Sequence, residues 1–125
     1  MSYVMANPNP AHRLTGDCVI RAISIAENKT WDDVFVELMT ESFYLKDVPS
    51  SNNAWGTYLH NNGYTRKMVD DVCPYCTVED FTQNHSDGTY ILGTGTHVIA
   101  VKDGSYYDTW DSGQEHPVYY FQKGE

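Results

Sequence analysis

The sequence has few basic residues: 8 lysines and arginines stand against 17 aspartates and glutamates, which gives a formal net charge of −9. Nucleic acids and anionic membrane surfaces repel such a charge, so we expect neither as a partner. The sequence also has no apolar run near the roughly 18 residues that span a bilayer. Residues 1–10 contain neither the basic nor the apolar region of a secretory signal peptide. These absences together predict a cytoplasmic protein.

Cysteine is scarce as well, with 3 residues in 125, an odd number. Secreted domains held together by disulfides usually carry an even set, so we expect no disulfide framework and a reducing compartment. Internal repeats, low-complexity tracts and long linkers are also missing. With 41% hydrophobic and 14% aromatic residues, the chain has enough apolar material for the core of one domain over residues 1–125.

The spacing of apolar and capping residues predicts helices first and strands afterwards. After an extended or looped segment over 1–14, helices are expected near 17–27, from 30 onward, near 49–62 and near 77–81. Strands are expected near 64–69, 90–92, 96–101, 106–110 and 118–121, with a tight hairpin at Asp103-Gly104. The predicted inner face of the second helix is formed by Trp31, Val34, Phe35, Leu38 and Met39. This pattern predicts an α+β fold with N-terminal helices packed on a C-terminal antiparallel β-sheet.

One stretch, Thr15 to Ala26, places a cysteine at the start of an apolar helix. Apolar residues recur with helical spacing from Val19 onward, and Asp17 is the predicted N-cap, which puts Cys18 in the first turn. Amide N–H groups and the positive end of the helix dipole favour a thiolate there. A buried structural cysteine explains the same pattern, so the rest of the chain has to decide between the two.

The predicted hairpin brings a histidine and a carboxylate together. A two-residue turn at Asp103-Gly104 pairs Lys102 with Ser105, so His97 and Asp108 become diagonal neighbours on one face of adjacent strands. The Asp108 carboxylate then accepts the Nδ1–H of His97 and leaves Nε2 free as a base. A thiol, a base and a residue that orients the base are typical of a nucleophilic hydrolase. The alternative is a sheet histidine beside an unrelated surface aspartate.

Cysteine at a helix start, then histidine and aspartate on successive strands, resembles the papain-like cysteine peptidase superfamily. The segment Gly16 to Ile23 is similar to the nucleophile segment of ovarian-tumour-type deubiquitinases. The segments 88–92 and 95–110 are similar to small papain-like proteins of phages and bacteria. The resemblance implies that Cys18 is the nucleophile, His97 the general base and then acid, and Asp108 the orienting residue. It implies hydrolysis of a peptide or isopeptide bond in a protein or peptide substrate, through a thioacyl-enzyme.

The sequence departs from the papain-like pattern at the oxyanion hole, where such enzymes typically carry a glutamine a few residues before the cysteine. His12 stands 6 positions before Cys18, and Asn9 lies further upstream. The backbone N–H of Cys18 supplies one donor, and Asn9 or His12 is the candidate for the second. The candidate oxyanion and substrate-binding residues are therefore Asn9, His12, Asp17 and Trp110.

Two other functions fit parts of the sequence. A papain-like fold that hydrolyses nothing and binds a host protein fits the missing glutamine and the acidic, tyrosine-rich composition. Cys73-Pro74-Tyr75-Cys76 matches the redox motif of glutaredoxins, which suggests a dithiol oxidoreductase. Because the helix-rich first half lacks the βαβ unit of that fold, two ordinary cysteines in a solvent-near loop are the simpler interpretation. No pair of histidines has the spacing of zinc ligands, so we expect no metal and no cofactor.

Overall fold

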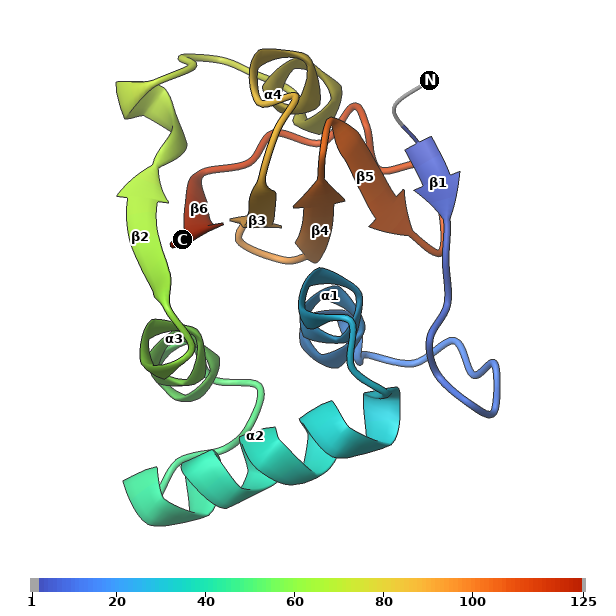
Figure 1. The fold of residues 1–125 in the computed structure, drawn as a ribbon, viewed down its shortest axis with the longest axis vertical. Helices are drawn as coiled ribbons and strands as arrows, with labels where there is room; N and C mark the ends of the chain where they lie inside the picture. The colour runs from blue at the N-terminus through green and yellow to red at the C-terminus, as the bar shows by residue number, and fades with distance from the viewer. Residues whose placement is uncertain (1–2, 125) are drawn as a thin grey trace.

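Polar turns divide the chain into short helices and strands, which the computed structural model describes over residues 3–124 (Figure 1). Within these residues the architecture is α+β, with four α-helices, one 3-10 helix and a six-stranded mixed sheet. The helices are α1 (Cys18–Glu27), α2 (Trp31–Leu45), α3 (Asn52–Asn61), η1 (Val69–Asp71) and α4 (Val78–Asn84). The strands are β1 (Tyr3–Met5), β2 (Tyr64–Met68), β3 (Thr89–Gly93), β4 (Val98–Lys102), β5 (Ser105–Asp108) and β6 (Tyr119–Lys123). No helix in this part of the chain has the length and apolarity needed to cross a membrane.

Capping residues set several of the helix boundaries. The Thr30 hydroxyl accepts a hydrogen bond from the Asp33 N–H at 3.1 Å at the start of α2. Thr77 and Asp80 form a reciprocal capping box at the start of α4. Beyond the end of α3, Gly63 has a φ of 89°, the left-handed conformation that glycine adopts without a steric penalty. The boundaries predicted at these positions are confirmed.

The Asp103-Gly104 turn fixes the register of the hairpin between β4 and β5. Both turn residues have positive φ angles, 49° and 83°, as a type I′ turn requires. Lys102 pairs with Ser105 and Val101 with Tyr106, which confirms the predicted register. The start of β4 and the end of β5 therefore lie at the same end of the sheet.

The sheet is mixed, which corrects the prediction of a purely antiparallel, C-terminal sheet. Its strand order is β1-β5-β4-β3-β6-β2, and β1 pairs in parallel with β5. The hairpin alone would leave the outer edge of β5 unpaired, and the extended N-terminal segment covers that edge. Pro8 and Pro10 keep this segment out of a helix. The pairing is between segments about 100 residues apart, so local sequence patterns did not predict it.

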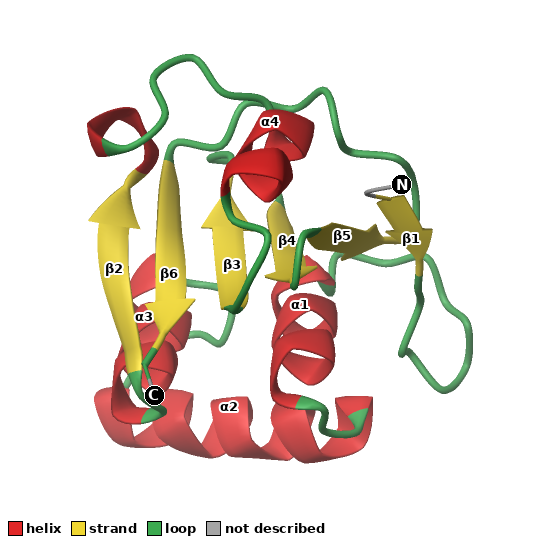
Figure 2. Cartoon of the chain, turned by 45° about the horizontal axis from the view of Figure 1, so that its top comes forward, coloured by secondary structure: helices red, strands yellow, loops and turns green. Residues whose placement is uncertain are grey.

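Alternate residues of the central strands pack into two apolar layers, one on each face of the sheet. Ile91 and Ala100 belong to the layer with α1, α2 and α3, whereas Leu92 and Ile99 belong to the layer with η1 and α4. Figure 1 shows α1, α2 and α3 below the sheet and α4 above it. Figure 2 shows α2 running beneath α1 and α3. Both faces of the sheet are covered by apolar layers. Polar side chains from different elements therefore come together at the ends of the strands.

The inner face of α2 is narrower than predicted. Val34 and Leu38 are buried as expected, but Phe35 and Met39 are 38% and 45% exposed, so their assignment to the core is wrong. The buried stripe follows an i, i+4 spacing, because α2 touches α1 and α3 only along one edge. Phe35 instead stacks on Trp31 near the surface, with ring centroids 5.2 Å apart.

Candidate active site

The three predicted catalytic residues meet at one end of the sheet. Cys18 is the first residue of α1, His97 immediately precedes β4, and Asp108 is the last residue of β5. Because α1 packs along β4, its N-terminal tip lies beside the start of that strand. The Cys18 thiol lies beside the His97 side chain and the backbone of Val98, and both of these groups lower its pKa. His97 Nε2 lies 2.6 Å from Asp108 Oδ2.

The orientation of the His97 ring corrects the predicted roles of its two nitrogens. Nε2, and not Nδ1, contacts Asp108, which leaves Nδ1 for the thiol. The reason is the position of the sulfur beside the Val98 backbone. Because Nε2 is occupied by the carboxylate, Nδ1 is the ring nitrogen left for the sulfur. The order of thiol, imidazole and carboxylate is the one expected from the sequence.

The thiol and the imidazole stabilise each other's charged forms. Burial raises the pKa of Cys18, but hydrogen bonds with His97 and the Val98 backbone, and the positive charges of His97 and Arg21, hold it below its usual range. Burial lowers the pKa of His97, whereas Asp108 and Cys18 together raise it to about 9. His97 is therefore protonated at neutral pH, and it favours the thiolate form of Cys18.

Asp108 is buried, and both of its carboxylate oxygens have partners. Oδ2 accepts a hydrogen bond from Ser112 Oγ at 2.7 Å in addition to the one from His97. Oδ1 accepts from Arg21 at 3.2 Å and from the Thr109 N–H at 2.8 Å. Burial raises the pKa of Asp108, but the hydrogen bonds from His97 and Ser112 and the charge of His97 hold it below its usual range. The carboxylate therefore stays ionised and stabilises the imidazolium.

Asp17 occupies the N-cap position of α1, as predicted, but its side chain makes no capping hydrogen bond. The carboxylate instead accepts hydrogen bonds from Arg21 at 2.8 Å, Trp31 Nε1 at 2.9 Å and Asn9 Nδ2 at 3.2 Å. A buried carboxylate gains more from a guanidinium than from a backbone N–H, which explains the inward orientation. Arg21 also contacts Asp108, so one guanidinium joins α1 to the Asp108 carboxylate.

Sequence reasoning did not identify Arg21, Trp31 or Ser112 as parts of this site. One signal was present: Asp17 and Arg21 have the i, i+4 spacing of a helical ion pair. The helical spacing of Trp31 predicts a core position, and only the fold turns its indole N–H toward Asp17. Ser112 lies beyond the predicted strands, so its contact with the carboxylate had no local signature.

A cleft of about 380 Å³ opens over Cys18 and His97. Trp110 forms one wall, and its ring stacks on that of His97 with centroids 5.3 Å apart. The other lining residues are Arg13, Leu14, Thr15, Gly16, Arg21, Thr96 and Thr109. Of the predicted substrate-binding residues, Trp110 borders the thiol, whereas Asn9 lines an adjacent hollow and His12 lines neither.

Comparison of the chain with protein-family models, with curated proteins and with solved structures found no match. A functional assignment therefore depends on the site itself. The fold and the site together describe an α+β protein in which a cysteine at a helix N-terminus lies beside a histidine that is hydrogen-bonded to an aspartate.

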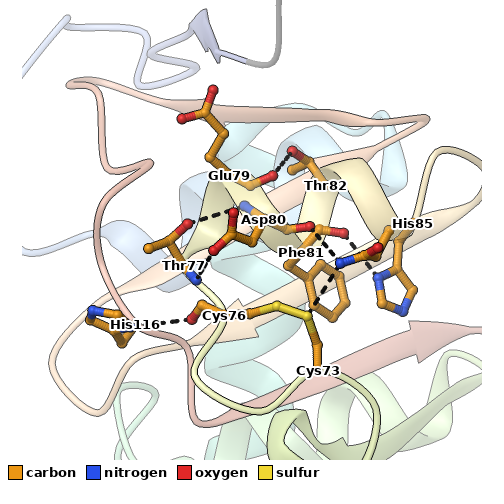
Figure 3. The surroundings of a disulfide bond; sticks show 10 residues. Cys73, Cys76, Thr77, Glu79, Asp80, Phe81, Thr82, His85 and His116 are labelled. Carbon is orange, nitrogen blue, oxygen red and sulfur yellow. Dashed lines mark hydrogen bonds between the residues drawn. A yellow bond between two sulfur atoms is a disulfide. The ribbon is translucent and has the colours of Figure 1, made fainter.

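Cys73 and Cys76 form a disulfide (Figure 3), which corrects the prediction of unpaired cysteines in a solvent-near loop. Their Cα atoms are 5.5 Å apart, a separation typical of disulfides. The loop between η1 and α4 brings them together by turning back at Tyr75, which has a φ of 63°. Both cysteines are buried beside Phe81, in the layer that contains α4, and Asn84 Nδ2 donates to Cys73 Sγ at 3.3 Å.

The disulfide lies on the face of the sheet opposite to the layer that contains Cys18. α4 begins at Val78, after Cys76, so its N-terminus is not adjacent to Cys73 in the chain. The helix start that would activate Cys73 in a dithiol oxidoreductase is therefore displaced from it. We interpret the disulfide as structural.

Removing the disulfide is expected to lower the free energy of unfolding by about 2 kcal/mol, because the bond closes only a short loop in the unfolded chain. Urea denaturation of the Cys73→Ala/Cys76→Ala double variant, compared with the wild type, measures this difference. Alkylation of Cys18 should proceed at the wild-type rate in the variant. A slower rate of Cys18 alkylation would show that the disulfide influences the candidate active site, and it would contradict a purely structural role.

Proposed function

We propose that this chain is a papain-like cysteine hydrolase that cleaves an amide bond, either a peptide or an isopeptide bond. The observation that carries the proposal is the series Cys18–His97–Asp108 beneath an open cleft. A lowered thiol pKa and a raised imidazole pKa in one pair favour the charged state that such catalysis requires. The family resemblance of the motifs around these residues supports the same reaction.

In the first half of the proposed reaction, the Cys18 thiolate attacks the amide carbonyl carbon and forms a C–S bond while the carbonyl oxygen takes the electron pair. The C–N bond then breaks, and His97 donates its Nδ1 proton to the leaving amine. In the second half, the neutral His97 removes a proton from water, and the hydroxide adds to the thioester. The C–S bond breaks, the thiolate is restored and the acid is released. Asp108 keeps the imidazole oriented throughout.

The backbone N–H of Cys18 is the first donor for the oxyanion in this proposal. It belongs to the first turn of α1, where N–H groups have no acceptor within the helix. The positive end of the helix dipole adds to its effect.

Release of amines from a mixture of denatured proteins tests the proposal. The wild type should hydrolyse the mixture, and Cys18→Ala should reduce the rate to the uncatalysed background. The rate should rise with pH as Cys18 ionises below its usual range, and it should fall near pH 9, where His97 loses the proton needed by the leaving amine. The Cys73→Ala/Cys76→Ala variant is the matched control and should retain the activity.

A catalytically silent binding module is the second candidate function. The observation that favours it is the position of the two predicted oxyanion donors: Asn9 contacts Asp17, and His12 does not line the cleft. Rapid alkylation of Cys18 combined with no amine release from the protein mixture would support this candidate. Measurable hydrolysis that disappears in Cys18→Ala would exclude it.

A further inference from the structure

A second hollow, of about 360 Å³, lies between α3 and the strands β2 and β6. Part of its lining is aromatic: Trp55 lies 5.3 Å from Phe121 and 6.1 Å from Tyr119 between ring centroids. The other lining residues are Asn52, Asn53, Gly56, Thr57, His60, Tyr64 and Arg66. Gly56 of α3 presents no side chain there, which keeps the hollow open. The hollow therefore combines aromatic and polar lining residues, a combination that suits an aromatic side chain with a polar neighbour.

This hollow and the cleft over Cys18 have no lining residue in common, but neighbouring strands connect them. The Cys18 thiol lies beside the backbone of Val98, and Val98 pairs with Gly93 across β4 and β3. The Tyr119 ring lies directly over Gly93, so closely that a Cβ at position 93 would overlap it. Cys18 and Tyr119 also pack against the same apolar layer. Tyr119 thus lies two strands from Val98, on the face of the sheet against which Cys18 packs.

Arg66 places a positive charge at the rim of the hollow. Its guanidinium lies 4.7 Å from the centroid of the Tyr119 ring. Within residues 3–124, no carboxylate lies at ion-pair distance from Arg66. In a chain with a net charge of −9, an arginine without an acidic partner at the edge of an aromatic hollow is complementary to an anionic group of a ligand.

We propose that this hollow binds an aromatic side chain of the substrate, while Arg66 pairs with a carboxylate on the neighbouring residue. The substrate class is therefore a polypeptide segment that carries an acidic and an aromatic residue close to the scissile amide. This inference rests on the proposed function, because it assigns the hollow to the substrate that Cys18 attacks. The aromatic walls contribute apolar and stacking contacts, and the guanidinium selects among aromatic segments by charge.

Peptidyl electrophiles of matched size test this specificity. In the first series, the dipeptides Phe-Glu, Phe-Gln and Ala-Glu carry a chloroacetyl group on their N-terminus. In the second series, the reverse sequences Glu-Phe, Gln-Phe and Glu-Ala carry a chloromethyl ketone at their C-terminus. The two series place the dipeptide on opposite sides of the carbon that Cys18 attacks. In every reagent the Cys18 thiolate displaces chloride. In one of the two series, the wild type should react roughly 10-fold faster with the phenylalanine reagent than with the alanine reagent. It should prefer glutamate over glutamine by roughly 3-fold, as expected for an exposed ion pair.

Two variants separate the two parts of the hollow. Arg66→Gln should abolish the preference for glutamate and keep the preference for phenylalanine. Gly56→Leu should abolish the preference for phenylalanine, because the leucine side chain fills the hollow. Lys67→Gln is the matched control, because Lys67 is on the same strand but contacts Gln122 on the other face, and it should keep both preferences. Arg66 is exposed, so its variant is expected to fold.

The outcomes distinguish the inference from the proposed function. Iodoacetamide, which is too small to reach the hollow, should label Cys18 at the same rate in all these variants. Fast labelling by iodoacetamide without discrimination among the peptidyl reagents would overturn the inference and leave the proposed function standing. A faster reaction with the glutamine or alanine reagents would overturn it as well. Labelling of Cys18 no faster than an ordinary thiol would instead overturn the proposed function.

Discussion

Replacing His97 with alanine is expected to slow the alkylation of Cys18 by iodoacetamide at pH 6.5 by roughly 50-fold, since an ordinary thiol is only about 1% ionised there. In the wild type, the hydrogen bond and the positive charge of His97 are main causes of the lowered pKa of Cys18. Burial acts in the opposite direction and remains in the variant. The pKa of Cys18 should therefore return to or exceed the ordinary thiol range, and the thiolate should form only at alkaline pH.

The measurement is the rate of Cys18 alkylation between pH 5 and pH 10, with the labelled residue identified by mass spectrometry. The wild-type rate should reach its plateau at a lower pH than the rate of the variant, and the two rates should converge at alkaline pH. His116→Ala is the matched control: this exposed histidine faces the carbonyl of Cys76, remote from the thiol, and its removal should leave the profile unchanged. Identical profiles for the wild type and His97→Ala would show that the two side chains do not form an ion pair.

Replacing Arg21 with methionine is expected to lower the free energy of unfolding by about 3–5 kcal/mol, because it leaves buried carboxylates without their cation. Arg21 pairs with Asp17 at 2.8 Å and with Asp108 at 3.2 Å, and all three residues are at most 8% exposed. A loss of this size is a large part of the roughly 5–15 kcal/mol that stabilises a typical domain.

The pH dependence of stability gives a second readout of the same cluster. The pKa values of Asp17 and Asp108 lie below their usual range in the folded protein, so their stabilising contribution is present above about pH 4 and is lost as the pH falls. In Arg21→Met these pKa values should rise, and the loss of stability on acidification should become smaller. Urea denaturation at pH 7 and at about pH 3 measures both effects, because the loss begins below about pH 4.

Arg13→Met is the matched control for Arg21→Met, because Arg13 lines the same cleft but is exposed and has no ion pair within residues 3–124. It should change the free energy of unfolding by less than about 1 kcal/mol. Adding Asp17→Asn to Arg21→Met should recover part of the lost stability, because it neutralises one of the two carboxylates. Equal stability of Arg13→Met and Arg21→Met would show that the buried cluster does not stabilise the fold.

Elements with a strong local signal were predicted well. The cap at Thr30, the capping box at Thr77 and the Asp103-Gly104 turn each depend on residues within four positions of one another, so the chain encodes them without reference to the fold. The proximity of His97 to Asp108 follows from that turn, because one register determines which side chains become neighbours.

Features that depend on distant segments were predicted poorly. The parallel pairing of β1 with β5, the exposure of Phe35 and Met39, and the pairing of Cys73 with Cys76 depend on which surfaces meet after folding. Asp17 is the clearest case: its position before a helix predicts a cap, but Arg21 and Trp31 draw the carboxylate into the interior. A local preference worth about 1 kcal/mol is overridden when a buried cation is in reach.

The sequence by itself determined that a cysteine begins a helix and that a two-residue turn sets a histidine beside an aspartate, because both are short-range consequences of backbone conformation. Only the tertiary structure decided that the helix tip meets the strand ends, which nitrogen of His97 faces the sulfur, and that Arg21 connects Asp17 with Asp108. The physical reason is that these contacts join segments separated by about 80 to 90 residues. Such segments are brought together by the burial of the apolar layers on the two faces of the sheet, which no local pattern encodes.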